Sequence, residues 1–191
     1  MTNMHLLVGL GNIGSEYELT RHNFGFLLLD KIIEDYAFNR IAAKKFHSEI
    51  FAGEIFGKKI IAIKPQTFMN RSGIAVLETA NFYKILPENI LVFHDEVDLV
   101  LGKLRVKVGG RNAGHNGLKS IDEAIGKDYT RLRLGVGRPE NPEFSTADYV
   151  LGKFGKEEMK AVKNVNKKVS NLIGNLLEGR ADEFLNKFHL V

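Results

Sequence analysis

The sequence predicts an α/β protein: one globular domain in which helices pack on both faces of a central, mixed, twisted sheet. Short strand-like runs alternate with stretches whose apolar residues recur at helical spacing. A hairpin signal within this alternation adds antiparallel strands, so the sheet is expected to be mixed. The 191 residues, 44% of them hydrophobic, suffice for one compact core, and no repeat or linker divides the chain.

The N-terminal part supplies a strand followed by a helix. Residues 5–8 are an apolar run of the kind that forms a buried strand. Apolar side chains recur at helical spacing across residues 24–37. Asn23 immediately before them is the expected N-cap, because its side-chain oxygen can accept a free backbone N–H.

Two β-rich runs follow and predict a hairpin. Residues 46–56 and 59–64 are rich in β-forming residues, and Gly57-Lys58 between them is a tight-turn signal. Pro65 ends the second run because proline has no N–H to donate to a neighbouring strand. The hairpin therefore joins a sheet that the strand-helix alternation otherwise makes parallel.

The middle of the chain returns to alternating helices and strands. Residues 72–83 predict a helix, and residues 90–93 predict a buried strand. Residues 103–108 and 131–136 alternate between polar and apolar side chains, as half-buried strands do. Residues 118–125 between them predict another helix.

The chain closes with a long helix that has two different faces. Ser145 and Asp148 resemble a capping box, and a helix is expected over residues 156–178, with Gly179 ending it. One stripe is apolar and predicts packing on the body of the protein; it consists of Val162, Val165, Val169, Leu172 and Leu176. The opposite face is either solvated or a contact surface for a phosphate backbone; it carries Lys160, Lys163 and Lys167.

Composition excludes several classes of protein. The absence of cysteine excludes disulfides, thiolate metal sites and a cysteine nucleophile. No apolar stretch approaches the roughly 20 residues that a membrane helix needs. The N-terminus has no signal-peptide pattern, so we expect a cytoplasmic protein without a membrane partner. The net charge of +4 and the pI near 9.2 permit a polyanionic partner.

A glycine motif after the first strand raises a dinucleotide-binding oxidoreductase as the alternative function. Gly9-Leu10-Gly11-Asn12-Ile13-Gly14 satisfies the G-x-G-x-x-G pattern, and Asp30 has the spacing of the acidic residue that binds a ribose in such folds. However, the first helix is expected to start several residues after Gly14, and Asp30 falls inside that helix. The context therefore argues against this alternative.

Five separated motifs carry a more specific resemblance. They are Gly11-Asn12-Ile13-Gly14-Ser15-Glu16-Tyr17, Thr20-Arg21-His22-Asn23, Phe68-Met69-Asn70-Arg71-Ser72-Gly73, His94-Asp95-Glu96-Val97-Asp98 and Gly114-His115-Asn116-Gly117-Leu118-Lys119. In this order and spacing they resemble the bacterial peptidyl-tRNA hydrolase family, from the first strand to the basic C-terminal helix. The resemblance implies one domain over residues 1–191, a monomer, and hydrolysis of the ester between a peptide and tRNA.

The resemblance also implies roles for residues at the matching positions. His22 and Asp95 would be catalytic, and Asn12, Asn70 and Asn116 would bind the substrate. Further substrate or tRNA contacts are implied for Tyr17, His115, Arg105, Lys107 and Arg133. For His115 a structural role in holding the glycine loop stays open. The expected partner is the acceptor end of peptidyl-tRNA, without DNA, metal or cofactor.

Two loops and the long helix complete what the resemblance implies. Residues 139–146 would form a substrate lid, and residues 156–168 would contact tRNA. Ile13 and Val100 stand where the family usually has proline, so we expect two loops near the site to be looser.

Elementary chemistry gives these residue types a rationale. An ester is already activated relative to an amide, so a positioned water can attack it without a metal or a covalent intermediate. Histidine can accept a proton from that water, which contributes about 10² to 10⁴ in rate. An aspartate on the other ring nitrogen fixes the tautomer and stabilises the imidazolium. We therefore expect His22 to be the base and Asp95 to orient it.

Neutral asparagine amides suit both the developing oxyanion and the peptide bond beside the ester. An aminoacyl-tRNA with a free amine carries an ammonium there, and burying that charge against uncharged groups is costly. The three asparagines are therefore expected to select N-blocked substrates. Each of them is an equal candidate for the oxyanion contact.

Basic residues flank a loop rich in glycine, whose backbone N–H groups can approach an anion. They are Arg105, Lys107, Arg111, Arg131 and Arg133. We expect these side chains to grip phosphates of the acceptor end, with solvated charges on strands as the alternative. Contacts to phosphates and shape, not to base edges, suit an enzyme that serves every tRNA.

Ordinary structural roles stay open for single residues. His22 could be a surface histidine, Asn70 a helix cap and Tyr17 a core residue. His94-Asp95-Glu96 could belong to a metal site, but no partner spacing such as H-E-x-x-H accompanies it. A non-catalytic RNA-binding module is the third function hypothesis.

Overall fold

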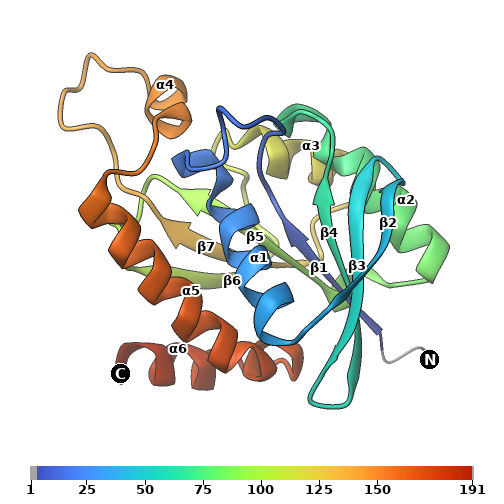
Figure 1. Cartoon of the computed structure of the whole chain (residues 1–191). Helices are drawn as coiled ribbons and strands as arrows, with labels where there is room; N and C mark the ends of the chain where they lie inside the picture. Colours follow the sequence, from blue (N-terminus) through green and yellow to red (C-terminus); the bar gives the residue numbers. More distant parts are fainter. Residues whose placement is uncertain (1–3, 191) are drawn as a thin grey trace.

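One mixed sheet of seven strands forms the centre of the molecule (Figure 1). A computed structural model describes residues 4–190, except the side chains of residues 42–44. The strands are β1 (Met4–Gly9), β2 (Asn39–Lys45), β3 (Ser48–Ile55), β4 (Lys58–Pro65), β5 (Ile90–Glu96), β6 (Leu104–Val108) and β7 (Thr130–Gly135). Their order is β2-β3-β4-β1-β5-β7-β6. The β4-β1-β5-β7 pairings are parallel and the others antiparallel, which confirms the expected mixed sheet.

Helices cover both faces of this sheet, as expected. They are α1 (Phe24–Asp35), α2 (Ser72–Tyr83), α3 (Asn116–Ile125), α4 (Thr146–Leu151), α5 (Lys156–Leu177) and α6 (Ala181–Leu190). Buried side chains of α1, α5 and α6 meet Leu7 of β1 in one core. Buried side chains of α2 and α3 meet Leu6 and Val8 in the other. Successive residues of β1 thus face opposite cores, as the two-residue period of a strand requires.

The turns of the first half differ from the prediction. The sequence pattern misses β2, whose pairing with β3 makes Phe46 and His47 a tight turn with φ of 51° at both residues. β3 consequently starts at Ser48. The next turn lies at Phe56 and Gly57, not at Gly57-Lys58, because Lys58 already pairs with Ile55. Positive φ at both central residues is the requirement of a type I′ hairpin turn.

The prediction that Asn23 caps α1 is wrong. α1 begins at Phe24 as expected, but the Asn23 side chain makes no capping hydrogen bond. Its amide instead holds the backbone of Asn12: Oδ1 accepts the Asn12 N–H at 2.8 Å, and Nδ2 donates to the Asn12 carbonyl at 2.9 Å. Asn23 therefore fixes the loop after β1, not the helix end.

The second half follows the prediction more closely. α2 has the predicted bounds, and the hydroxyl of Ser145 accepts the N–H of Asp148 at 3.0 Å, as the predicted cap requires; the short helix α4 that it begins is an addition. β5 runs beyond the predicted residues to Glu96 and so includes Asp95. The apolar stripe of α5 packs on the body, and its lysines 160, 163 and 167 are exposed. α6 is an addition that the sequence pattern does not predict.

The parallel strands bring their carboxyl ends to one edge of the sheet. Two short 3₁₀ turns, η1 (Arg21–Asn23) and η2 (Met69–Arg71), follow β1 and β4 at that edge. Ligand sites of α/β proteins form at this edge, between the loops that leave the strands. Within residues 4–190, none of the helices combines the length and the apolar character that crossing a bilayer demands.

Candidate active site

A cleft of about 580 Å³ opens at the carboxyl edge of the sheet. Its walls come from the loops after β1, β4, β5 and β7, from the start of α3 and from α4. The cleft brings together six of the predicted site residues: Asn12, His22, Asn70, Asp95, His115 and Asn116. These positions are spread over more than half of the sequence, so only the fold makes them neighbours.

His22 and Asp95 form a hydrogen-bonded pair at the floor of this cleft. Nδ1 of His22 lies 2.8 Å from Oδ1 of Asp95. His22 lies in η1, directly before α1, and Asp95 is the second-last residue of strand β5. The carboxyl side chain is 2% exposed and the imidazole 12%, so one edge of the ring faces the cleft.

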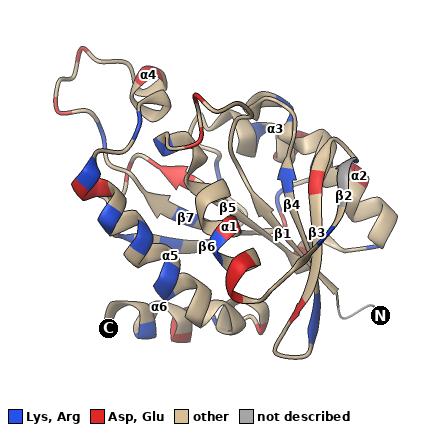
Figure 2. Cartoon of the chain, in the orientation of Figure 1, with Lys and Arg blue, Asp and Glu red and all other residues tan. Residues whose placement is uncertain are grey.

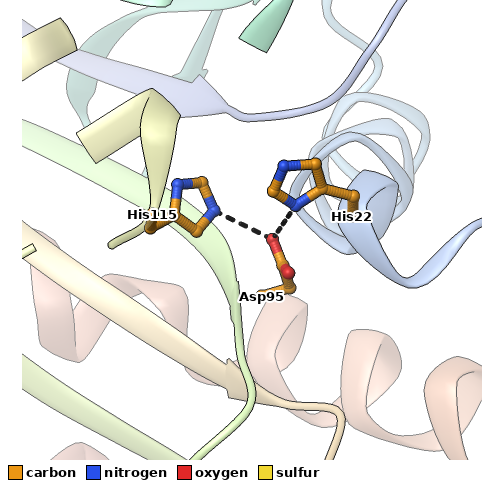
Figure 3. Close-up of side chains that lie close together, drawn as sticks. All are labelled: His22, Asp95 and His115. Carbon is orange, nitrogen blue, oxygen red and sulfur yellow. Dashed lines mark hydrogen bonds and ion pairs between the residues drawn. The ribbon is translucent and has the colours of Figure 1, made fainter. Parts of the chain in front are cut away.

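His115 is a second imidazole on the same carboxylate oxygen. Its Nε2 lies 2.9 Å from Oδ1 of Asp95, and Figure 3 shows both rings directed at that atom. Nδ1 of His115 accepts the backbone N–H groups of Gly117 and Leu118 at 3.1 and 3.3 Å, which caps α3. Because this nitrogen accepts, the ring must carry its proton on Nε2 and donate it to Asp95. Both nitrogens of His115 are thus engaged by the protein.

The charges of the cluster are mutually dependent. Burial alone would lower the pKa of His22, but the charge of Asp95 and the hydrogen bond to it outweigh burial and raise the pKa above 6.5. Burial alone would raise the pKa of Asp95, yet His22 and His115 hold that pKa far below its ordinary value. Asp95 is therefore ionised at neutral pH and strengthens the basicity of His22.

A third histidine lies beneath these two. His94 is buried, and its ring centroid is 5.1 Å from that of His115. Its Nδ1 donates to the carbonyl of Asp95 at 2.8 Å. Burial lowers the pKa of His94 to about 3, so the ring is neutral, and its hydrogen bond holds the backbone of Asp95.

The three side chains of Figure 3 also have the spacing of metal ligands. One possible ligand atom from each of His22, Asp95 and His115 lies within 4.8 Å of the other two. A histidine ligand must offer an unprotonated nitrogen to the metal. Nε2 of His115 carries a proton, because Nδ1 is occupied by backbone donors. The cluster therefore fits a hydrogen-bond network better than a metal centre.

Asparagine amides line the cleft around the histidine. Oδ1 of Asn12 accepts the N–H of Met69 at 2.9 Å, so its NH₂ group remains as a donor in the cleft that Asn12 lines. Asn70 and Asn116 are exposed there, and their side chains make no hydrogen bond within residues 4–190. Asn70 does not cap α2, whose start has no side-chain capping bond. Asn112, which no motif of the sequence singles out, also lines the cleft.

Arg21, the neighbour of His22, ties the α4 wall to the start of α5. Its Nη2 lies 3.0 Å from both carboxylate oxygens of Glu158, and its guanidinium carbon lies 4.3 Å from the centre of the Tyr149 ring. The backbone N–H of Arg21 donates to the Gly152 carbonyl at 3.0 Å. These contacts fix α4 relative to the residue that precedes His22.

Some of the basic residues predicted to contact phosphate are exposed, and others form ion pairs with acidic side chains. Arg131 is buried in an ion pair with Asp122 at 2.6 Å, so the prediction that it grips phosphate is wrong. Arg133 contacts Glu96 at 2.9 Å and keeps part of its surface. Arg105 and Lys107 are exposed on β6. The ribbon of α5 carries several blue lysine positions in Figure 2.

Tyr17 is half-buried and does not line the cleft. Its carbonyl accepts both the N–H and the hydroxyl of Thr20, at 3.0 and 2.8 Å, and so shapes the turn before His22. The substrate contact that the resemblance implies for Tyr17 stays a prediction.

The glycine motif serves helix packing. A Cβ on Gly9 would lie 2.6 Å from the carbonyl oxygen of Gly25, and a Cβ on Gly11 would lie 2.6 Å from the Phe26 ring. The two glycines therefore admit the first turn of α1, which begins ten residues after Gly14. A dinucleotide needs a helix N-terminus directly at the motif. The structure gives the oxidoreductase alternative no support, and Asp30 pairs with Lys64 at 2.8 Å.

Other residues hold the site in place without being singled out by the sequence motifs. Asn23 and Arg21 are two of them, and the only sequence signal for this supporting role is that they flank His22. Glu96 and Arg138 line the cleft next to Asp95, and only the end of β7 beside β5 brings Arg138 there. No spacing in the sequence indicates that contact.

Comparison with known proteins gives the same family as the motifs of the sequence. The family model described as peptidyl-tRNA hydrolase matches residues 6–190. A peptidyl-tRNA hydrolase of Rickettsia conorii is 47% identical over 184 residues, which cover 96% of this chain and 99% of the relative. One from Wolbachia sp. subsp. Drosophila simulans is 51% identical over 183 residues, covering 96% and 98%.

A solved structure agrees with these sequences. The crystal structure of peptidyl-tRNA hydrolase from Acinetobacter baumannii matches with a TM-score of 0.90 and 38% identity, and the match covers 98% of this chain and 95% of that one. The similarity therefore extends over the sheet, the helices and the cleft. This chain belongs to the peptidyl-tRNA hydrolase family.

Proposed function

We propose that this protein hydrolyses the ester bond between an N-blocked peptide and the 3′ ribose of tRNA, and so recycles tRNA in the cytoplasm. The observation that carries the proposal is the His22–Asp95 pair at 2.8 Å, because it leaves Nε2 of His22 without a partner within residues 4–190 and beside the cleft. An imidazole oriented in this way is a general base with a free acceptor.

In the proposed reaction, Nε2 of His22 takes a proton from a water while that water attacks the ester carbon. Asp95 accepts the hydrogen bond from Nδ1–H of His22 throughout and, without taking the proton, stabilises the imidazolium. The imidazolium then returns a proton to the departing 3′ oxygen of tRNA, which leaves the peptide as a free acid. His115 positions Asp95 and does not exchange protons with the substrate.

Asn12 is the best placed donor for the oxyanion in this proposal. Its acceptor oxygen is occupied by the Met69 N–H, so only its NH₂ group is available to the substrate. The exposed amides of Asn70 and Asn116 are assigned to the peptide bond next to the ester. All these groups belong to one chain, so the reaction requires no second copy.

The test compares two substrates in the presence of a chelator. Release of tRNA from N-acetyl-aminoacyl-tRNA is measured beside release from the same aminoacyl-tRNA with a free amine. We expect turnover of the blocked substrate only, because Asn70 and Asn116, which are assigned to the peptide bond, offer an ammonium no compensating charge. Equal rates would contradict the role of the asparagines. Binding without turnover of either substrate would identify a tRNA-binding module instead.

The basic face of α5 is assigned to the tRNA backbone, together with Arg105, Lys107 and Arg133. Replacing Lys160, Lys163 and Lys167 with alanine is expected to weaken tRNA binding and to flatten its salt dependence, by a slope of about 0.9 for each lost phosphate contact. Filter binding over a range of salt concentrations measures both effects.

A control for this variant removes the same charge elsewhere. Lys58 and Lys59 begin β4 and Lys84 lies between α2 and β5, so all three lie towards the edge of the sheet opposite the cleft. Their replacement with alanine should leave the slope unchanged. Equal slopes for the two triple variants would make the α5 face a solvated surface.

A further inference from the structure

Arg138 is the only lysine or arginine among the described residues that line the cleft. It follows β7, whose end lies beside Glu96 of β5, and this register brings its side chain into the cleft. Neither Arg105 nor Lys107 reaches the cleft wall, and the guanidinium of Arg133 is engaged by Glu96. Among the described residues, Arg138 is therefore the one side chain of this cleft with a permanent positive charge.

Asp98 binds the Nε–Nη2 edge of the Arg138 guanidinium. Its Oδ1 accepts Nε of Arg138 at 3.0 Å and Nη2 at 2.5 Å. The Nη1 donors and the second proton of Nη2 are left for a ligand. The Arg138 side chain is 61% exposed, so the group is oriented but open to solvent.

The negative charge of Asp95 would repel an anionic ligand in the cleft unless a positive charge compensates it. Asp95 is ionised and carries no lysine or arginine partner within residues 4–190. An anionic ligand that approaches His22 therefore meets a like charge unless a cation faces it. A planar guanidinium binds phosphate oxygens in pairs and is the side chain best suited to that task.

The substrate class supplies a phosphate at the right place. The nucleoside that carries the ester on its 3′ oxygen carries a phosphodiester on its 5′ oxygen, across the same ribose. We propose that Arg138 binds this terminal phosphate, with Asp98 as its positioning residue. The inference rests on the proposed function, and it concerns a group separate from the basic residues of β6, β7 and α5.

Two non-hydrolysable inhibitors test the contact. Both are 3′-(N-acetyl-aminoacylamido)-3′-deoxyadenosines, one with a free 5′ hydroxyl and one with a 5′-phosphate; an amide replaces the ester. Their inhibition constants are measured against N-acetyl-aminoacyl-tRNA. In the wild-type protein the phosphorylated form is expected to bind about tenfold tighter, the strength of one charge-assisted contact.

The variant Arg138→Gln should reduce the ratio of the two inhibition constants to about one and leave the unphosphorylated inhibitor unaffected. Arg138→Lys keeps the charge without the planar fork, so an intermediate ratio is expected. Arg180→Gln removes an exposed arginine between α5 and α6 and should keep the wild-type ratio.

A wild-type ratio of one, or a full ratio in Arg138→Gln, would overturn the inference while turnover of N-acetyl-aminoacyl-tRNA upholds the proposed function. An equal loss of affinity for both inhibitors in Arg138→Gln would also overturn it, because that result makes Arg138 a structural support. Absence of turnover in the wild type would overturn the proposed function and, with it, this contact.

Discussion

Replacing His22 with alanine is expected to lower kcat for release of tRNA from N-acetyl-aminoacyl-tRNA by about a thousandfold, within the range that a general base contributes. The residue makes its side-chain hydrogen bond to Asp95 and offers only Nε2 to the cleft. Affinity for tRNA should change little, because the proposed contacts to the nucleic acid come from other elements. Single-turnover release and filter binding measure the two quantities separately.

The chain contains a matched control for this variant. His47 makes the same kind of bond, with Nδ1 2.8 Å from a carboxylate oxygen of Glu78, but it is exposed and lies outside the cleft. His47→Ala should retain full activity. If His22→Ala kept more than a tenth of wild-type kcat, or lost tRNA binding together with activity, the role of His22 as the base would be refuted.

Asp95→Asn is the second large effect, with an expected loss of about a hundredfold to a thousandfold in kcat. An asparagine keeps the size and one acceptor oxygen but removes the charge that stabilises the imidazolium. The same charge holds the pKa of His22 above 6.5. Since the base must be unprotonated, kcat/KM of the wild type should rise with pH through that raised pKa.

The pH profile separates this role from a general loss of structure. Without the carboxylate charge the pKa of His22 falls, so the inflection in kcat/KM of Asp95→Asn should move to lower pH. Glu78→Gln, which alters the exposed pair with His47, should leave both rate and inflection unchanged. An inflection that stays at the wild-type pH in Asp95→Asn would show that Asp95 does not set the basicity of His22.

Many helices and strands of the fold depend on the pattern of neighbouring residues, so they could be predicted from the sequence. α2 has the bounds predicted for residues 72–83, and the long amphipathic pattern of α5 predicts both its buried stripe and its exposed lysines. β2 escapes because an edge strand has no two-sided burial to produce a regular pattern. The sequence does carry a signal for α6, because Phe184 and Phe188 lie one helical turn apart and are both buried.

The site depends on contacts that no spacing reveals. Arg131 and Arg133 stand two positions apart on β7, yet one is buried against Asp122 and the other keeps part of its surface. The amide of Asn23 has the right position for a helix cap and instead holds the Asn12 backbone. The residues of the His22–Asp95 pair are 73 positions apart. Resemblance to a family suggested these two residues, and the parallel sheet brings them together.

The bonding of His115 restricts what this position tolerates. Its ring accepts two amide protons on one side and donates a proton on the other, so a single side chain spans from the first turn of α3 to the acid beneath His22. Asparagine and glutamine carry donor and acceptor on one small group, and neither bridges that gap across a rigid ring. We therefore expect exchange of His115 to disturb both the start of α3 and the carboxylate that orients His22.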